Sequence, residues 1–175
     1  MTTSEGNGEP HGSPLGRYDP DVSDAMYEVQ LLNVPLRLLV AGREHHDDVM
    51  REFAMLALAD DMDAEHTPKR MLELVDVLGR RYAAAAARPD AEVDDAIVRG
   101  ATSIDLVYQV PAHVADATDE LAALMDEADE FCRERRLLSL ARPALVVEFS
   151  AWYLDEFRRQ IAGEPARPWD GPAEL

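Results

Sequence analysis

Two short runs of alternating apolar and polar residues, each ending in Val-Pro, constrain the fold of this chain most. The first run covers residues 26–32 and stops at Asn33-Val34-Pro35; the second begins at Ile104 and stops at Val110-Pro111, 76 residues after the first Val-Pro. A period of two is typical of a half-buried strand. Because proline has no N–H for a sheet ladder, we expect each strand to end there.

Helical patterns follow both predicted strands. We expect helices over residues 36–58, from 67 to Pro89, over 90–98, over 112–136 and from Pro143 to 161. Thr67 and Pro68 form a favoured helix start, and Pro89 should interrupt the helix that begins there. The last helix has an aromatic face, which we expect to be buried: Phe149, Trp152, Tyr153 and Phe157.

The order strand–helix–helix therefore occurs twice. It predicts a mainly helical α+β domain over residues 24–162 with a small two-stranded sheet, and possible repeats over 26–101 and 103–162. The matching Val-Pro positions favour a duplication, although any two strand–helix–helix units resemble each other at this level. Two strands alone make a poor sheet, so they should pair with each other or with a second subunit while helices cover one face.

Both ends of the chain have the composition of irregular segments. Residues 1–23 are rich in glycine and proline and predict a disordered tail, and residues 163–175 predict an irregular C-terminal tail. Trp169 stands out in that second tail, and the sequence leaves open whether it packs back on the domain.

Charge and composition exclude several classes of function. The 175 residues include 17 basic and 35 acidic ones, and the net charge of −18 argues against nucleic acid and anionic membranes as partners. The chain has no apolar stretch near the ~20 residues of a membrane span and no signal-peptide core, so we expect a cytoplasmic protein. One cysteine permits neither an internal disulfide nor a cysteine-rich metal site.

Two places carry side chains capable of chemistry. Residues 44–48 read Glu-His-His-Asp-Asp, but His45 and His46 point about 100° apart on a helix, so we expect a solvated face and no metal or other cofactor. Cys132 lies beside Arg133, which would activate a thiol, yet Phe131 favours a buried structural cysteine.

An acidic stripe on the predicted helix 112–136 is a candidate partner surface. We expect it to be solvated, because it lies opposite Leu121, Leu124 and Ala128. It consists of Asp116, Asp119, Glu120, Asp126, Glu127, Asp129 and Glu130. The candidate partner-binding residues are Asp126, Glu127 and Glu130 from this stripe, with Trp152 and Tyr153 as aromatic interface anchors.

The strand, the Val-Pro turn and a later helix with an internal glutamate resemble the N-terminal part of GHKL-type anti-sigma serine kinases. The matching stretches are residues 73–77 (Glu-Leu-Val-Asp-Val) and 148–152 (Glu-Phe-Ser-Ala-Trp). In that family the glutamate is the catalytic base and an asparagine four residues later helps hold magnesium; here Val77 and Trp152 take its place. The resemblance implies an ATP-binding serine kinase as an alternative function.

The whole chain is more similar to a group of small actinobacterial regulatory proteins. The shared segments are Val34-Pro35, Glu44-His45, residues 51–53, residues 126–132 and residues 152–157. This resemblance implies a non-enzymatic interaction protein in a stress or sigma-factor partner-switching circuit, with an anti-sigma kinase, its antagonist or a serine phosphatase as partner. A third possibility is an acidic mimic that blocks a basic nucleic-acid-binding protein.

Self-association is also expected. The aromatic residues of the last two helices exceed what a two-stranded sheet can cover, and exposed strand edges invite pairing. Because two-fold dimers are the commonest oligomers, the sequence predicts a homodimer.

Overall fold

The two strands pair with each other in a small antiparallel sheet. In the computed structural model, which describes residues 25–58 and 67–174, β1 (Met26–Pro35) pairs with β2 (Ser103–Pro111). One face of the sheet is buried at Val29 and Leu106, and the other is exposed at Glu28 and Gln109. The period of two and the pairing of the strands with each other are therefore confirmed.

β1 ends at Pro35, as the Val-Pro signal indicated, but it contains a bulge that the sequence did not predict. The strand continues through a bulge, where the register shifts between Leu31 and Val34, and its last residue, Pro35, lies opposite Ser103. Asn33 forms the bulge with a φ of 56°, a left-handed conformation that asparagine tolerates better than most residues. Its N–H donates to Asp105 Oδ1 at 2.7 Å, so the loss of alternation at Asn33 marks a bulge inside the strand, and the strand stops at Pro35, the last residue of the predicted stop.

Helices complete a mainly helical α+β fold, as predicted. The described elements follow the order β1-α1-α2-β2-α3-α4, with α1 over Leu36–Leu58, α2 over Thr67–Val98, α3 over Val114–Arg133 and α4 over Ala144–Ile161. The strand–helix–helix order thus occurs twice, and its origin in a duplication stays a prediction. None of the described helices combines the length and the apolar character needed to cross a membrane.

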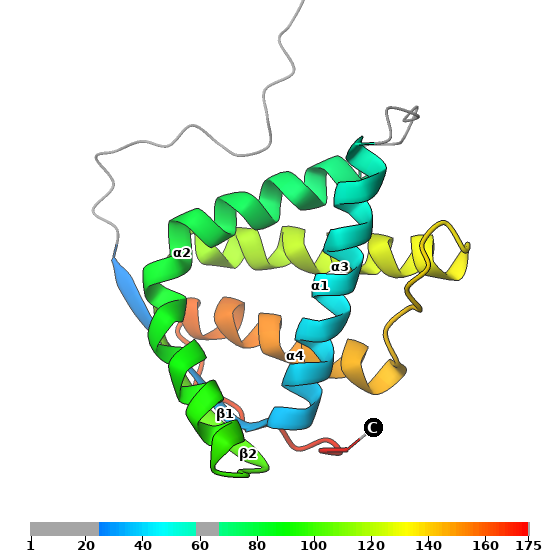
Figure 1. Ribbon diagram of the computed structural model, residues 1–175. Helices are drawn as coiled ribbons and strands as arrows, with labels where there is room; N and C mark the ends of the chain where they lie inside the picture. Colours follow the sequence, from blue (N-terminus) through cyan, green and yellow to red (C-terminus); the bar gives the residue numbers. More distant parts are fainter. Residues whose placement is uncertain (1–24, 59–66, 175) are drawn as a thin grey trace, which may run out of the picture.

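α2 is one helix, whereas the sequence predicted a break at Pro89. Pro89 lies inside the helix and is buried, and α2 continues to Val98. Figure 1 shows that α2 bends part-way along its length, so that one part lies over α3 and the other descends toward the sheet. A proline inside a helix removes one backbone hydrogen bond and bends the helix without necessarily ending it.

The buried apolar side chains form two clusters. The sheet cluster joins the inner face of the sheet to the start of α1, the end of α2 and α4, and includes Leu31, Leu38 and Phe149. The distal cluster lies among the end of α1, the start of α2 and α3, and includes Phe53 and Leu124. α1 runs away from the sheet and contributes to both clusters (Figure 1).

The aromatic face of α4 belongs to the sheet cluster, as predicted. Phe149 and Phe157 are buried, and Trp152 and Tyr153 are half-buried against them. The rings pack edge-on or tilted at centroid distances of 5.2 to 6.5 Å, which are favourable arrangements for aromatic pairs.

The C-terminal segment (residues 162–174) is irregular, as predicted, but it is part of the fold. Trp169 is only 4% exposed and packs in the sheet cluster. The backbone N–H of Trp169 donates to Leu32 O at 2.9 Å, and Asn33 Nδ2 donates to Trp169 O at 2.8 Å. The segment therefore lies along the outer edge of β1. The predicted disordered tail, residues 1–23, lies outside the described residues.

Candidate functional site

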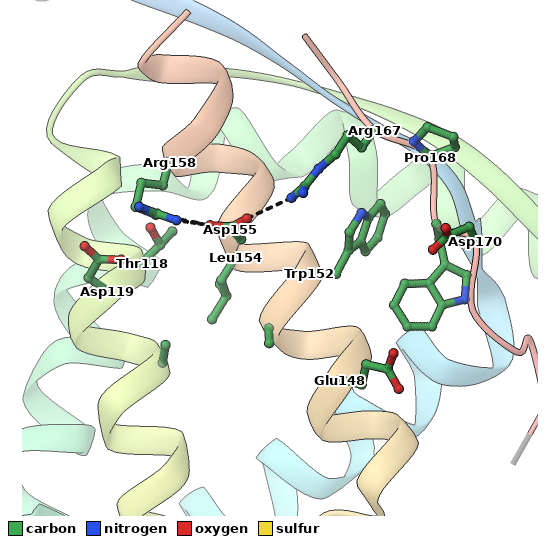
Figure 2. A pocket seen from close by; sticks show the side chains of 13 residues that line it. Thr118, Asp119, Glu148, Trp152, Leu154, Asp155, Arg158, Arg167, Pro168 and Asp170 are labelled. Atoms are coloured by element: carbon green, nitrogen blue, oxygen red, sulfur yellow. Dashed lines mark hydrogen bonds and ion pairs between the residues drawn. The ribbon is translucent and has the colours of Figure 1, made fainter. Parts of the chain in front are cut away.

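A cleft of about 840 Å³ lies between α3, α4 and the C-terminal segment (Figure 2). Residues at helical spacing on α3 and α4 form two of its walls, and residues 167–170 form the third. Ala122 and Ala151 line it with only methyl groups, which leaves room between the helices. The charged and aromatic lining residues are Asp119, Glu148, Trp152, Asp155, Arg158, Arg167, Trp169 and Asp170.

Asp155 on α4 is the centre of an ion-pair network in the cleft. Figure 2 shows it between Arg158, one turn further along α4, and Arg167 of the C-terminal segment. Arg158 donates to Asp155 Oδ1, and Arg167 Nη2 donates to Oδ2 at 2.8 Å. Partial burial would raise the pKa of Asp155, but the two guanidinium groups lower it overall, so this carboxylate stays ionised.

Glu156, the residue after Asp155, holds the C-terminal segment that forms the third wall of the cleft. Its side chain is fully buried, and its oxygens accept hydrogen bonds from Arg167 N at 3.0 Å, Arg167 Nε at 2.9 Å, Arg159 Nη1 at 2.8 Å and Gln160 Nε2 at 2.9 Å. Burial would raise the pKa of Glu156, but these donors lower it overall. Arg167 thus binds two adjacent carboxylates and fixes the C-terminal segment against α4.

Three further carboxylates at the cleft make no hydrogen bond or ion pair among the described residues, although the guanidinium of Arg158 attracts Asp119 at longer range. Asp119, Glu148 and Asp170 are exposed, and within residues 25–58 and 67–174 no hydrogen bond or ion pair engages their side chains. The cleft thus presents carboxylates around an aromatic wall. This arrangement attracts cationic side chains, which interact with carboxylates and with the faces of aromatic rings.

The two tryptophans at the cleft differ in how their indole N–H groups are satisfied. Their ring centroids are 5.5 Å apart with an interplanar angle of 63°. Trp169 Nε1 donates to Pro172 O at 3.0 Å, whereas Trp152 Nε1 is buried and meets no acceptor among the described residues. Buried tryptophan N–H groups usually find a partner, so Trp152 is held at this wall at some cost in free energy.

The candidate partner-binding residues do not come together at one place. Trp152 lines the cleft, but Tyr153 faces the opposite side of α4, where its hydroxyl lies 2.6 Å from that of Tyr108. Burial raises the pKa of Tyr153 well above its ordinary value. The acidic candidates lie outside the cleft lining: Asp126 accepts from Arg142 Nη2 at 3.0 Å, Glu130 accepts from Arg133 Nη1 at 2.5 Å, and Glu127 is half-buried.

The acidic stripe is not solvated along its whole length. The Asp129 side chain is only 1% exposed and accepts from Arg142 N at 2.9 Å and Arg142 Nε at 2.8 Å. His45 Nε2 lies 3.6 Å from Asp129 Oδ1. The expectation of a solvated stripe was therefore wrong for Asp129, which has a structural role in fixing the loop before α4.

The predicted solvated face at residues 44–48 is also partly wrong. His45 and His46 are half-buried, and burial lowers the pKa of both imidazoles. Across the described ranges, no group of three or more histidine, cysteine, aspartate or glutamate side chains could hold a metal ion. Cys132 is buried, as favoured from its sequence context, and burial raises the pKa of its thiol.

Sequence reasoning did not assign roles to Arg158 and Arg167. A signal was present, because Asp155 and Arg158 have the i, i+3 spacing of a helical ion pair. The Arg-Pro-Trp-Asp segment at 167–170 also combines a cation with an aromatic anchor. The contact of this segment with α4 depends on the direction that the chain takes after Gly163. Hydrophobic periodicity gives no information about that direction.

Comparison of the chain with protein-family models, with curated proteins and with solved structures finds no match.

Proposed function

We propose that the protein is a non-enzymatic protein-interaction module whose cleft binds a basic segment of a partner protein. The observation that carries this proposal is the combination of an aromatic wall with three carboxylates, Asp119, Glu148 and Asp170, that have no hydrogen bond or ion pair among the described residues. Asp155, in contrast, is already neutralised by Arg158 and Arg167. A lysine or arginine of a partner would form ion pairs with these three carboxylates. An apolar side chain next to that residue would contact Trp152.

The net charge supports a basic partner. At −18, the chain attracts a positively charged protein over a distance of roughly 10 Å at moderate salt, which speeds encounter and rejects acidic competitors. The resemblance to small actinobacterial regulators supports a place in a sigma-factor partner-switching circuit in the cytoplasm. An anti-sigma kinase, its antagonist or a serine phosphatase is therefore the proposed partner.

Charge reversal at the cleft tests the proposal. The tagged full chain is used to capture proteins from a lysate of its host, and the captured partner is identified by mass spectrometry and purified for calorimetry. We expect the double variant Glu148→Lys/Asp170→Lys to bind this partner at least about tenfold more weakly, which corresponds to about 1.4 kcal/mol. The matched control, Asp94→Lys/Asp95→Lys, changes the net charge equally on exposed positions of α2 and should bind almost normally.

Equal weakening by both double variants would contradict the cleft and indicate a long-range effect of net charge. Two other outcomes would replace the proposed function. A clear rise of the melting temperature with Mg-ATP would favour the kinase, since a ligand that binds the folded state stabilises it. Capture of a nucleic-acid-binding protein, with DNA or RNA competing for it, would favour the acidic mimic.

A further inference from the structure

A second hollow lies on the opposite side of α4 from the cleft. It has a volume of about 330 Å³, lies between α1, α3 and α4, and is open to solvent on one side. Leu39 and Phe149 of the sheet cluster form part of its wall, and Leu121 and Met125, which pack on the distal cluster, form another part. The hollow therefore lies at the seam between the two buried clusters, and apolar side chains of both line it.

Polar groups of the hollow come mainly from one face of α1. Arg43, His46 and Asp47 line it from α1, and Ser150 lines it from α4. Arg43 Nη2 is already paired with Asp90 Oδ1 at 2.7 Å, and the Asp47 carboxylate would repel an anion. His46 and Ser150 are half-buried and offer hydrogen-bonding groups without a fixed charge at neutral pH.

The size of the hollow limits what it can hold. An engineered protein cavity of about 150 Å³ lined by aliphatic and aromatic residues binds benzene. A hollow of about 330 Å³ is about twice as large, so it fits a two-ring molecule and is too small for a helix of a partner protein. Phe149, Tyr153 and the thioether of Met125 are the side chains that favour an aromatic body over an aliphatic one.

We propose that the hollow between α1, α3 and α4 is a binding site for a small neutral aromatic molecule of two fused rings with one hydrogen-bonding head group. The rings fill the seam between the sheet cluster and the distal cluster, and the head group lies toward His46 and Ser150. Such a ligand contacts both clusters at once and so stabilises the folded protein as a unit. The site is separate from the proposed partner cleft, although Leu154 lines both.

Gly42 gives a direct test, because it lines the hollow from α1. A Cβ added at this residue would meet only Val146 Cγ1, at 3.9 Å, so a larger side chain is tolerated and extends into free space. The variant Gly42→Leu should fill the hollow and abolish ligand binding. The matched control, Gly42→Ala, has a similar gain in helix propensity but leaves most of the volume empty, so it should bind as the wild type does.

The probe is 2-naphthol, with calorimetry and melting temperature as readouts. At a hundred times its dissociation constant, 2-naphthol should raise the melting temperature of the wild type and of Gly42→Ala by roughly 5–10 °C. It should have no effect on Gly42→Leu. Ser150→Met fills the hollow from the opposite wall and should also abolish binding, which keeps the test valid if Gly42→Leu does not fold.

Two results would overturn the proposal. One is the absence of binding to the wild type at millimolar 2-naphthol, and the other is equal binding to the wild type and both filled variants. The charge of the head group is tested with the same ring system: 2-naphthoate and 2-naphthylmethylammonium should bind at least about tenfold more weakly than 2-naphthol, and tighter binding of either ion would overturn the assignment of a neutral ligand.

Discussion

The side-chain amide of Gln160 in α4 takes the place of a neighbouring strand beside Gln30 in β1. Gln30 N–H donates to Gln160 Oε1 at 2.9 Å, and Gln160 Nε2 donates to Gln30 O at 2.8 Å. The backbone N–H of Trp169 adds a further hydrogen bond along this edge of β1 by donating to Leu32 O at 2.9 Å. One edge of the two-stranded sheet is thus closed by a helix side chain and by the C-terminal segment, which protects an edge that would otherwise invite pairing.

Removal of this amide should weaken the fold measurably. Gln160→Ala leaves both outward groups of Gln30 without protein partners and also removes a donor to Glu156, so the free energy of unfolding should fall by about 1–2 kcal/mol. The control is Gln109→Ala, which loses only an exposed side-chain contact to Glu28 and should cost less than about 0.5 kcal/mol. Urea unfolding measures both, and equal costs would contradict a special role for Gln160.

Glu156 should be among the polar residues most sensitive to substitution. Glu156→Gln keeps the shape of the side chain but removes the charge that Arg159 and Arg167 bind, which leaves the largely buried Arg159 without its buried counter-ion. We expect a loss of about 3–5 kcal/mol of unfolding free energy and a red shift of tryptophan fluorescence as Trp169 loosens. Asp94→Asn, on an exposed position, is the matched control and should change neither quantity. An unshifted spectrum would show that Glu156 does not hold the C-terminal segment.

The free energy of unfolding should fall as the pH is lowered, first below pH 6.5 and again below pH 4.5. Burial lowers the pKa of His45 and His46 from 6.5, so the unfolded chain binds more protons and stability is lost as the pH falls below 6.5 toward the lower folded values. Burial would raise the pKa of Glu156, but hydrogen bonding lowers it from 4.5. The stability that ionised Glu156 contributes is therefore lost as the pH falls below 4.5. Unfolding free energies measured between pH 7 and 4 test this. In His45→Gln/His46→Gln the slope between pH 7 and 5 should become flatter; an unchanged slope would contradict the first range.

Elements defined by short-range patterns were predictable from the sequence. α1 begins and ends where the periodicity placed it, at Leu36 and Leu58, and the alternation at Val29 and Leu31 identified the buried face of β1. These features depend on residues within one or two turns of each other. The bulge at Asn33 and the continuation of α2 through Pro89 were not predicted, because both residue types usually end an element but are tolerated inside one when the surrounding structure supports them.

The candidate site was much less predictable, because it is assembled from distant parts of the chain. The hydrogen bond between Asn33 and Trp169 joins residues 136 positions apart, and nothing in the local pattern of either residue indicates the other. The burial of Asp129 depends on Arg142, 13 residues later, which takes the carboxylate out of the acidic stripe. Charge and aromatic content therefore identified α3 and α4 as the helices that carry candidate partner-binding residues. They also selected Tyr153, whose ring faces away from the cleft.

The two tryptophans of the cleft should respond differently to the same substitution. Trp152→Phe removes a buried N–H that has no acceptor among the described residues, which offsets part of the lost packing, so the unfolding free energy should change by less than about 1 kcal/mol. Trp169→Phe removes the donor to Pro172 O and part of the ring of a residue that is only 4% exposed, so it should cost about 2–3 kcal/mol. Chemical denaturation checks the order. A larger cost at Trp152 would show that its N–H is satisfied in solution.

The aromatic face offers little of the predicted dimer contact, because Phe131 and Phe157 are only 7% and 6% exposed and the half-buried Trp152 lines the cleft, so we expect another contact. β2 offers one. Val107 lies opposite Gln30 in the sheet, and since the backbone groups of Gln30 point outward to Gln160, those of Val107 point outward on the other edge. Within the described ranges, no residue caps Val107 as Gln160 caps Gln30. Two β2 edges could therefore pair about a two-fold axis into a four-stranded sheet.

Val107→Pro tests this contact. Proline is tolerated where a strand N–H faces away from the sheet, so the variant should fold, but it cannot donate across the new edge and should be monomeric. Val107→Thr keeps the N–H and a β-branched side chain and should still dimerise. Because each copy carries −18, dimerisation of the wild type should strengthen as salt screens the repulsion. Light scattering coupled to size exclusion measures the mass, and a single-chain mass for the wild type at every salt concentration would rule out the homodimer.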